Sequence, residues 1–320
     1  MVLFLRENDI KSLLTMEDAL DAVEQAFRLQ GLGQSENSPR QRPHIGSSQL
    51  HVNACAISGI GLGLKAATVG SNGIRFVVLL WNETTGDLEA LIEAGYMGQL
   101  RTGAATGIAT KYLARDDATK VGMFGCGKQA WSQLLAVCSV RDIQKAWVYC
   151  RTPSSREEFS QTMSRNLRKP VEASESPKDV VVNADIIITI TRAKTPIFDH
   201  LWVRPGTHIN AAGSNRLESQ EISPDLIQRA SIISVDDHEQ ARIESGDLVS
   251  AINEGALDWH NVVELGQIVT GRRKGRMDES EITLFESQGI GIEDITLARK
   301  AYEKAMAQGV GEVIPDTVLG

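Results

Sequence analysis

Short, nearly continuous apolar runs recur in the second part of the chain. They cover Lys120–Phe124, Ala146–Cys150, Ala184–Thr191, His208–Gly213 and Ser231–Asp237. Such runs are typical of strands that are buried on both faces of a parallel sheet. An apolar helical stretch, Ala130–Val137, follows the first run at the spacing of a strand–helix–strand unit. The pattern therefore predicts an α/β domain built on a Rossmann-type, doubly wound parallel sheet.

A different pattern precedes these runs. Thr15 and Asp18 can cap a helix with one apolar stripe, and Gly31 is a fitting stop for it. Ser35–Arg42 is predicted to be a polar loop. Stretches of strand character then cover Leu50–Ile57, Leu62–Val69, Phe76–Trp81 and Leu88–Glu93, with a hairpin turn at Asn82–Gly86. We expect an antiparallel sheet with one solvated face, in an α+β domain.

A glycine-rich turn follows the first parallel strand directly. Gly125 and Gly127, with Ala130 three residues later, match the G-x-G-x-x-A fingerprint of dinucleotide-binding proteins. The first glycine permits the tight turn, and the second lets the backbone approach a pyrophosphate. The small Ala130 allows the next helix to pack on the strand, and the helix N-terminus offers N–H groups to phosphates. The turn predicts a dinucleotide site.

Composition excludes several classes of protein. The net charge of −8 argues against nucleic acid or an anionic membrane as a partner. There is no apolar run of 18 residues, and the first residues lack the pattern of a signal peptide. The four cysteines show no paired spacing and no metal motif. We expect a cytoplasmic protein that binds no metal.

Two further helices set the expected domain limits. Gly98–Leu113 precedes the first parallel strand, and the amphipathic stretch Asp294–Ala307 follows the last. We predict a first domain over residues 1–115, the dinucleotide-binding domain over 116–287, and a C-terminal segment, 288–320, that returns to the first domain.

Several motifs together resemble one family. They are Gly61–Lys65, Gln99–Ala105, the Gly125 turn, His208–Gly213, Glu244–Asp247 and Gly289–Asp294. In this order and spacing, the chain is similar to the ornithine cyclodeaminase/mu-crystallin family. The resemblance implies an NAD(P)-dependent enzyme that acts on the Cα–N bond of amino or imino acids. It also implies a homodimer built through the sheet of the first domain, which is then a substrate-binding and dimerisation domain.

Cationic residues are the candidates for substrate binding. A guanidinium matches a carboxylate with two parallel hydrogen bonds, and the resemblance gives this role to Arg101. It gives Lys65 a substrate contact, although a lysine in an apolar strand can also be an edge residue that points to water. Arg40 or Arg42 is the further carboxylate ligand, or a solvated loop charge. His51 either faces this site or is a surface histidine.

Asn215 departs from the family pattern. Cyclodeaminases carry an aspartate at the matching position, where it exchanges a proton with the substrate amine. An amide cannot exchange a proton at neutral pH. Asn215 therefore disfavours ornithine or lysine cyclisation but leaves hydride transfer to a preformed imine intact, with Lys65, His51 or water as the proton source. Its side chain can still hydrogen-bond the substrate nitrogen.

The cofactor residues follow from the fingerprint and the resemblance. NAD-binding turns usually place a carboxylate at the end of the second strand, whereas Arg151 and Thr152 stand here. We therefore expect NADP(H) slightly in preference to NAD(H). The predicted cofactor-binding residues are Thr102, Gly125, Gly127, Lys128, Gln129, Ala130, Arg151, Thr152, Thr189, Thr191, Asn215 and Gly289.

The sequence thus predicts an oxidoreductase of a small α-imino or α-amino acid. Ketimine reductase, iminosuccinate reductase and alanine dehydrogenase activities are all compatible with it. Lys65, Arg101, His51 and Asn215 form the predicted catalytic set, and Arg40, Arg42, Lys65 and Arg101 the predicted substrate ligands. Two alternatives remain: an ornithine or lysine cyclodeaminase, and a nucleotide-dependent ligand carrier of the mu-crystallin type.

Overall fold

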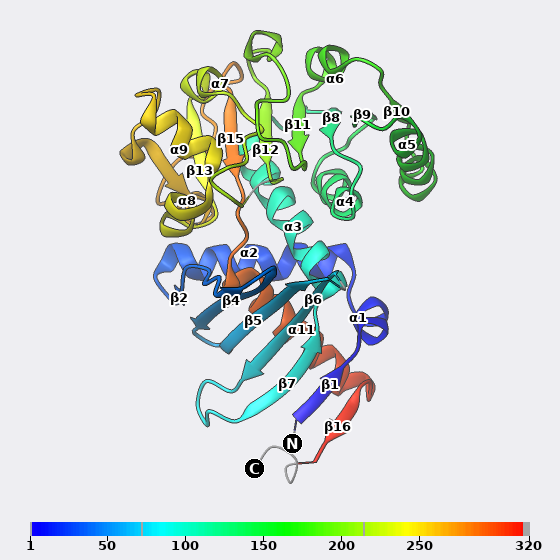
Figure 1. Ribbon diagram of the computed structural model, residues 1–320, viewed down its shortest axis with the longest axis vertical. Coiled ribbons are helices and arrows are strands. Elements are labelled where there is room, and N and C mark those ends of the chain that lie inside the picture. Colours follow the sequence, from blue (N-terminus) through cyan, green and yellow to red (C-terminus); the bar gives the residue numbers. More distant parts are fainter. Residues whose placement is uncertain (1, 72, 214, 316–320) are drawn as a thin grey trace. The chain divides into compact units, whose positions relative to one another are not determined.

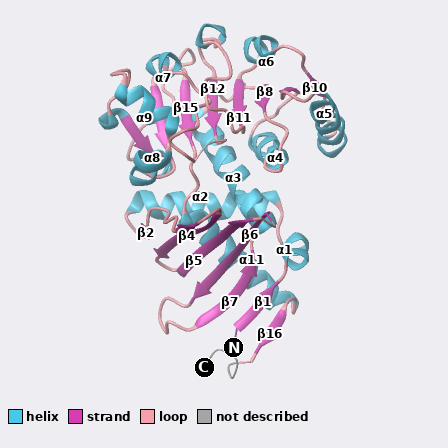
Figure 2. Ribbon diagram, viewed as in Figure 1, coloured by secondary structure: helices cyan, strands magenta, loops and turns pink. Residues whose placement is uncertain are grey.

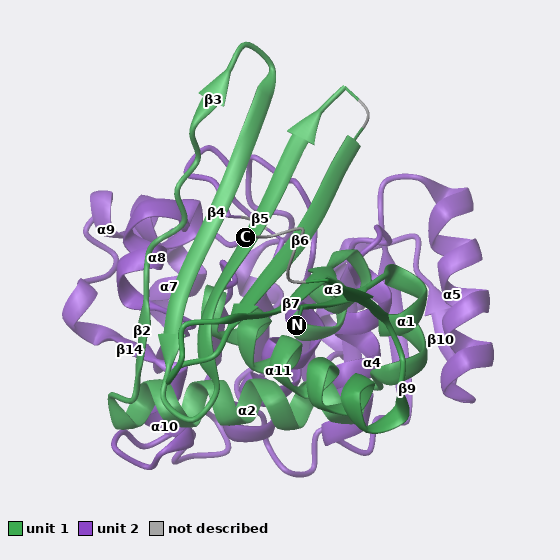
Figure 3. Ribbon diagram, turned by 90° about the horizontal axis from the view of Figure 1, so that it is seen from below, with its two compact units in different colours: residues 1–101, 290–320 green, residues 102–289 purple. Residues whose placement is uncertain are grey.

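The computed structural model describes residues 2–71, 73–213 and 215–315 (Figure 1). Its contacts divide the chain into unit 1, Met1–Arg101 with Ile290–Gly320, and unit 2, Thr102–Gly289 (Figure 3). Helix α3 (Gly95–Leu113) contains the first division point. The domain limits proposed after residues 115 and 287 stay predictions. In the described part of the chain, no helix is both long and apolar enough to cross a membrane.

Unit 1 contains a mixed sheet. The predicted strands form its antiparallel central part. Its strand order is β16 (Glu312–Ile314), β1 (Val2–Leu5), β7 (Leu88–Glu93), β6 (Gly73–Trp81), β5 (Gly61–Gly70), β4 (Ser48–Ile57) and β2 (Ser35–Asn37), with β3 (His44–Ile45) on β4. Among the described strands of this sheet, β1 and β7 are the one parallel pair. The expected loop at Ser35–Arg42 was partly wrong, because Ser35–Asn37 pairs with the end of β4.

The helices of unit 1 are α1 (Glu7–Leu13), α2 (Met16–Leu32), α11 (Gly291–Gln308) and the start of α3. Thr15 caps α2 as predicted, but the helix continues past Gly31 to Leu32, and Gly33 in the left-handed conformation is its C-cap. α11 packs against β4, β5, β6 and α2 (Figure 1). The contact is closest at Gly63, where an added Cβ would lie 2.3 Å from the Ile295 side chain.

Unit 2 contains the predicted parallel sheet. Its order is β10 (Val171–Ala173), β9 (Lys145–Tyr149), β8 (Lys120–Phe124), β11 (Ile186–Thr189), β12 (His208–Ala211), β15 (Thr283–Glu286), β13 (Ile232–Val235) and β14 (Val262–Glu264). All neighbouring strands are parallel. Several strands are shorter than their apolar runs, because the flanking residues form the loops. The chain reverses its direction of travel between β8 and β11, so this sheet is doubly wound.

Along the chain, helices separate most of the strands of unit 2 (Figure 2). They are α4 (Ala130–Val140), α5 (Pro153–Leu167), α6 (Pro177–Asn183), α7 (Pro224–Arg229), α8 (His238–Glu244), α9 (Gly246–Asn253) and α10 (Leu265–Val269), with short 3-10 turns at His200–Trp202 and Trp259–Asn261. On β11, Ile186 and Ile188 belong to an apolar cluster with α4 and α5, and Ile187 belongs to a second cluster with α6, α7 and α9. Because both faces are covered, β11 is apolar on both sides from Ile186 to Ile188.

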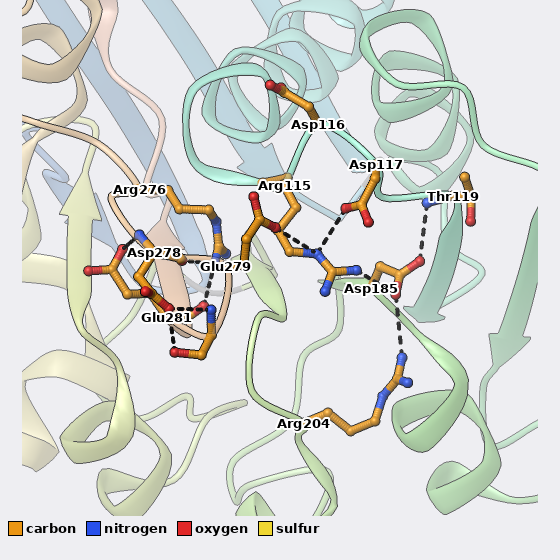
Figure 4. A network of polar contacts seen from close by, with 12 residues as sticks. Arg115, Asp116, Asp117, Thr119, Asp185, Arg204, Arg276, Asp278, Glu279 and Glu281 are labelled. Atoms are coloured by element: carbon orange, nitrogen blue, oxygen red, sulfur yellow. Dashed lines mark hydrogen bonds and ion pairs between the residues drawn. The ribbon is translucent and has the colours of Figure 1, made fainter.

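An ion network ties the amino ends of β8 and β11 together (Figure 4). Asp185, which precedes β11, accepts hydrogen bonds from the backbone N–H groups of Thr119 and Lys120 at 3.1 Å each. The guanidinium groups of Arg115 and Arg204 lie 3.3 and 3.4 Å from the same carboxylate. The network fixes the end of the sheet opposite to the glycine turn.

The close packing of α11 on β5 makes a stability prediction. Gly63→Ala should lower the free energy of unfolding by about 1–3 kcal/mol, because the new methyl group overlaps Ile295. Gly70→Ala on the same strand is the control, since its nearest neighbour would be Ser48 Oγ at 3.9 Å. Urea unfolding measures both. Equal stabilities of the two variants would contradict the packing described here.

Candidate functional site

Lys65 and Arg101 are held by two acidic residues at the start of α11. Lys65 Nζ lies 2.7 Å from Asp294 Oδ1, and Arg101 Nε lies 3.1 Å from the same oxygen. The other arm of Arg101 bonds Glu293 Oε2 at 2.7 Å. One carboxylate oxygen of Asp294 thus joins two cations that are far apart in the sequence. We call these four residues the unit 1 cluster.

The unit 1 cluster is buried. Lys65 is 7% exposed and Arg101 8% exposed, and both acidic residues are less exposed still. Burial lowers the pKa of Lys65 to about 8; Asp294 opposes this shift, whereas Arg101 and Arg40 add to it. Burial raises the pKa of Glu293, against the attraction of Arg101. A lysine with this pKa can give and take a proton near neutral pH.

Local structure explains how a lysine comes to be buried here. β5 is a central strand between β4 and β6, so Lys65 is not the edge residue that was one alternative. Gly98 on α3 leaves room for its ammonium group, since an added Cβ would lie 3.4 Å from Lys65 Nζ. The acidic pair stands in the first turn of α11, where the helix dipole favours negative charge.

Arg40 is tied to a neighbour of the unit 1 cluster. Its Nε donates to Asn53 Oδ1 at 3.1 Å, and Asn53 stands opposite Lys65 in the pairing of β4 with β5. His51 lies two residues earlier on β4, half-buried, with its Nε2 3.2 Å from Gln49 Oε1. Arg42 is also half-buried. This hydrogen bond to Asn53 therefore links Arg40 to the neighbourhood of Lys65.

The glycine turn of unit 2 has the geometry that its sequence predicts. Gly125 has a φ of +111°, and an added Cβ would lie 2.3 Å from the Ile190 carbonyl oxygen, so only glycine fits. Gly127 would meet nothing within 4 Å, which leaves space for a ligand to approach its backbone. Ala130 is fully buried and opens α4. These residues fit a dinucleotide pyrophosphate.

The position of the turn in the sheet supports this fit. It follows the carboxyl end of β8, and β8 and β11 are the neighbours between which the winding of the chain reverses. Ligands of doubly wound sheets bind in the crevice at this point. The topology and the turn therefore indicate the same place for a cofactor.

Two buried carboxylates brace the loops at this edge of the sheet. Glu221 accepts hydrogen bonds from Thr189 Oγ1 at 2.8 Å, Thr191 N at 2.7 Å and Gly213 N at 2.9 Å. Asp236 Oδ2 accepts from Gln288 N and Gly289 N at 2.8 and 2.5 Å. The hydroxyl of Thr189 is thus engaged with the protein. Thr191 and Gly289 lie in loops whose conformation these carboxylates fix.

The remaining predicted cofactor residues lie in several surroundings within unit 2. Thr102 is buried in α3, and its carbonyl accepts from Gln133 Nε2 at 3.1 Å. Lys128 is exposed, and Gln129 is half-buried just before α4. Arg151 and Thr152 are exposed after β9. Asn215 is half-buried in the loop that follows β12.

Comparisons with known proteins decide the family. The sequence pattern of the ornithine cyclodeaminase/mu-crystallin family matches residues 2–309. The chain belongs to this family. A Bacillus cereus Δ1-pyrroline-2-carboxylate reductase is 39% identical over 261 residues, which are 79% of this chain and 80% of the relative.

Two solved structures of the ornithine cyclodeaminase/mu-crystallin family resemble the fold closely. The Δ1-pyrroline-2-carboxylate reductase of Thermococcus litoralis, solved with NADH and L-proline, has a TM-score of 0.92 and 34% identity over 98% of this chain and all of that one. An archaeal alanine dehydrogenase dimer with bound NAD has a TM-score of 0.92 and 31% identity, covering 98% of this chain and 99% of the other. The Rossmann-type fold prediction is confirmed.

Several residues of this family member were not predicted from its sequence. Glu293 and Asp294 entered the prediction as the last residues of the Gly289–Asp294 motif, without a role of their own, and Asn53 and Glu221 were not singled out. A signal was present for Asp294 and Glu293: two acidic residues follow Gly289–Ile292 directly, inside a run that is otherwise apolar. Asn53 carried no comparable signal, because one polar residue in a half-solvated strand is ordinary.

The geometry of the unit 1 cluster yields a stability prediction. Asp294→Asn should lower the free energy of unfolding by about 3 kcal/mol or more, because it leaves buried cations without their shared carboxylate. Lys304→Met on the same helix is the control. It breaks a partly exposed pair with Asp18 and should cost at most about 1 kcal/mol. A loss from Asp294→Asn no larger than this would contradict the inferred dependence on Asp294.

Proposed function

We propose that this protein is an NAD(P)H-dependent oxidoreductase that moves a hydride between nicotinamide and the Cα of a small α-imino or α-amino acid. The observation that carries the proposal is the buried pairing of Lys65 and Arg101 with acidic residues of α11. Cationic side chains in fixed positions, such as Lys65 and Arg101, can bind and orient the carboxylate of a substrate. A cyclic imino acid is the favoured substrate, since the Bacillus reductase is 39% identical.

We assign each candidate residue a role in binding or proton transfer from the chemistry of its side chain. Arg101 and Arg40 bind the substrate carboxylate, and Lys65 exchanges a proton with the substrate nitrogen. The nicotinamide, when bound, supplies or accepts the hydride. Asn215 can orient the nitrogen by a hydrogen bond but cannot serve as the acid or base. Cyclodeamination therefore ranks below imine reduction, and a ligand carrier would not require a lysine whose pKa is lowered to about 8.

The direct test is an assay of cofactor oxidation. Purified protein is mixed with NADPH or NADH and a panel of Δ1-pyrroline-2-carboxylate, its six-membered homologue, iminosuccinate, and pyruvate with ammonia. Loss of the reduced-nicotinamide absorbance with a cyclic imine is expected. Binding of the cofactor without turnover on any member would favour the carrier. Ammonia release from ornithine or lysine would restore the cyclodeaminase.

The lowered pKa of Lys65 predicts a pH profile. Imine reduction needs the protonated ammonium, so kcat/KM for reduction should be level below pH 8 and fall above it. Oxidation of the amino acid needs the neutral amine and should rise over the same range. Lys65→Met should lower kcat by about 10²–10⁴-fold and remove this limb. Lys11→Met, in the exposed part of α1, serves as the control.

A reduction profile that keeps its decline above pH 8 in Lys65→Met would exclude Lys65 as the proton donor. Because cofactor binding is assigned to unit 2, the affinity of Lys65→Met for NADPH should equal that of the unaltered protein. This comparison separates a lost proton donor from a damaged fold.

Positive charge after β9 supports the proposed preference for NADP(H). Arg151 and Thr152 are exposed directly after β9, and Arg156 donates to the Cys150 carbonyl at 3.3 Å, so positive charge gathers where NAD enzymes place a carboxylate. The first carboxylate after this strand is Glu157. An arginine at this place suits a 2′-phosphate.

Arg151→Ala should reduce the ratio of kcat/KM for NADPH to that for NADH by about tenfold, the loss of one charge-assisted contact. Arg165→Ala is the control, since Arg165 lies on α5 and donates to the Gln161 carbonyl of its own helix. An unchanged ratio in Arg151→Ala would argue against a 2′-phosphate contact from this residue.

We further propose a homodimer that forms through the sheet of unit 1. Two strands of this sheet, β3 and β6, expose apolar side chains: Ile45 is 84% exposed and Ile74 50% exposed. These residues lie at the β3–β4 and β5–β6 hairpins, which extend beyond the rest of the sheet (Figure 3). The alanine dehydrogenase of similar fold is a dimer.

A further inference from the structure

Asn53 is a buried amide next to the proposed proton donor. It lies in the middle of β4, is 4% exposed, and stands directly opposite Lys65 in the register of β4 and β5. Residues in this relation project from the same face of a sheet, with their Cβ atoms about 5 Å apart. The amide of Asn53 and the ammonium-bearing chain of Lys65 are therefore neighbours on the face that α11 covers.

The orientation of the Asn53 amide follows from its hydrogen bond with Arg40. Asn53 Oδ1 accepts a hydrogen bond from Arg40 Nε at 3.1 Å, which assigns the other atom as the amide nitrogen. That nitrogen, Nδ2, is buried and has no hydrogen-bond partner among the described residues. A buried N–H group without an acceptor costs free energy, so an acceptor from outside the chain would complete the site.

The surroundings define the chemistry of that acceptor. Lys65 and Arg40 are cations, and an acceptor placed beside them and the amide is favoured when it carries negative charge. Of the nearby carboxylate oxygens, Asp294 Oδ1 bonds Lys65 and Arg101, and Glu293 Oε2 bonds Arg101. Glu293 Oε1 is buried without a hydrogen-bond partner among the described residues, so it does not satisfy the amide of Asn53 either. An oxygen of a bound carboxylate fits both requirements.

We propose that Asn53 is a substrate-binding residue whose Nδ2 donates to the carboxylate of the imino acid while its Oδ1 orients Arg40 toward the same group. The inference rests on the proposed function and adds a neutral donor to the cations. A neutral amide beside Lys65 also binds the carboxylate without adding a further positive charge, which would lower the proton affinity of the lysine.

Asn53→Asp separates the two roles of the side chain. The aspartate keeps an oxygen for Arg40 but replaces the N–H₂ donor with an anionic oxygen. KM for the imine and Kd for L-proline should rise about 10–100-fold, the loss of a hydrogen bond to a charged group. L-prolinamide lacks the anionic carboxylate, so its weaker binding should change little. The proline-to-prolinamide preference should therefore fall at least about tenfold.

Three controls make the outcomes distinct. Asn82→Asp introduces the same change in unit 1, where Asn82 Oδ1 accepts from Thr84 N and Thr85 N in a turn, and should leave the preference unaltered. NADPH affinity should remain within about twofold in both variants, which reports an intact cofactor site. Asn53→Ser introduces a smaller, neutral side chain and provides a second test if the aspartate variant does not fold. It should also reduce the proline-to-prolinamide preference.

Equal losses for proline and prolinamide in Asn53→Asp would indicate a purely structural role and overturn the proposal. An unchanged preference would overturn it as well, with the proposed function intact. Failure of the unaltered protein to bind or turn over any carboxylate of the assay panel would contradict the proposed function itself, and the role of Asn53 with it.

Discussion

The buried Asp294 carboxylate is the interaction on which unit 1 depends. One oxygen accepts from Lys65 Nζ at 2.7 Å and from Arg101 Nε at 3.1 Å, so it joins β5, α3 and α11. Two cations can be buried this deeply only when such a partner compensates for their lost hydration. The approach of α11 that brings Asp294 into place requires Gly63, because any side chain there would meet Ile295. Packing and electrostatics thus specify the same helix position.

Buried carboxylates also join separate segments in unit 2, where their hydrogen-bond donors are mainly backbone N–H groups and not cationic side chains. Glu221 holds Thr191 and Gly213, and Asp236 holds Gln288 and Gly289, each through N–H groups of loops at the carboxyl edge of the sheet. Loops carry the binding residues of such folds, and a rigid carboxylate beneath them preserves their conformation. In both units, buried acidic residues hold in place the groups that we propose as ligand-binding.

Apolar patterning predicted most of the fold because strands buried on both faces, such as Ile186–Thr189, leave a continuous signal. It overestimated strand lengths and missed short edge strands such as Ser35–Asn37, whose pairing depends on a distant neighbour. The glycine turn was predictable because the backbone at Gly125 has a positive φ, a local conformation that favours glycine. Lys65 and Arg101 were proposed from the family resemblance, whereas Asp294, Asn53 and Glu221 acquire their surroundings only through contacts between distant segments, which no local pattern records.

The most direct test of the central claim follows the hydride itself. Reduced cofactor that carries deuterium at nicotinamide C4, in each of its two stereoisomers, is incubated with Δ1-pyrroline-2-carboxylate and the protein. The account predicts that one stereoisomer delivers its deuterium to Cα of proline, as seen by NMR and mass spectrometry, and that Lys65→Met lowers this transfer while still binding the cofactor. Proline without deuterium at Cα from either stereoisomer, or transfer at an undiminished rate in Lys65→Met, would contradict it.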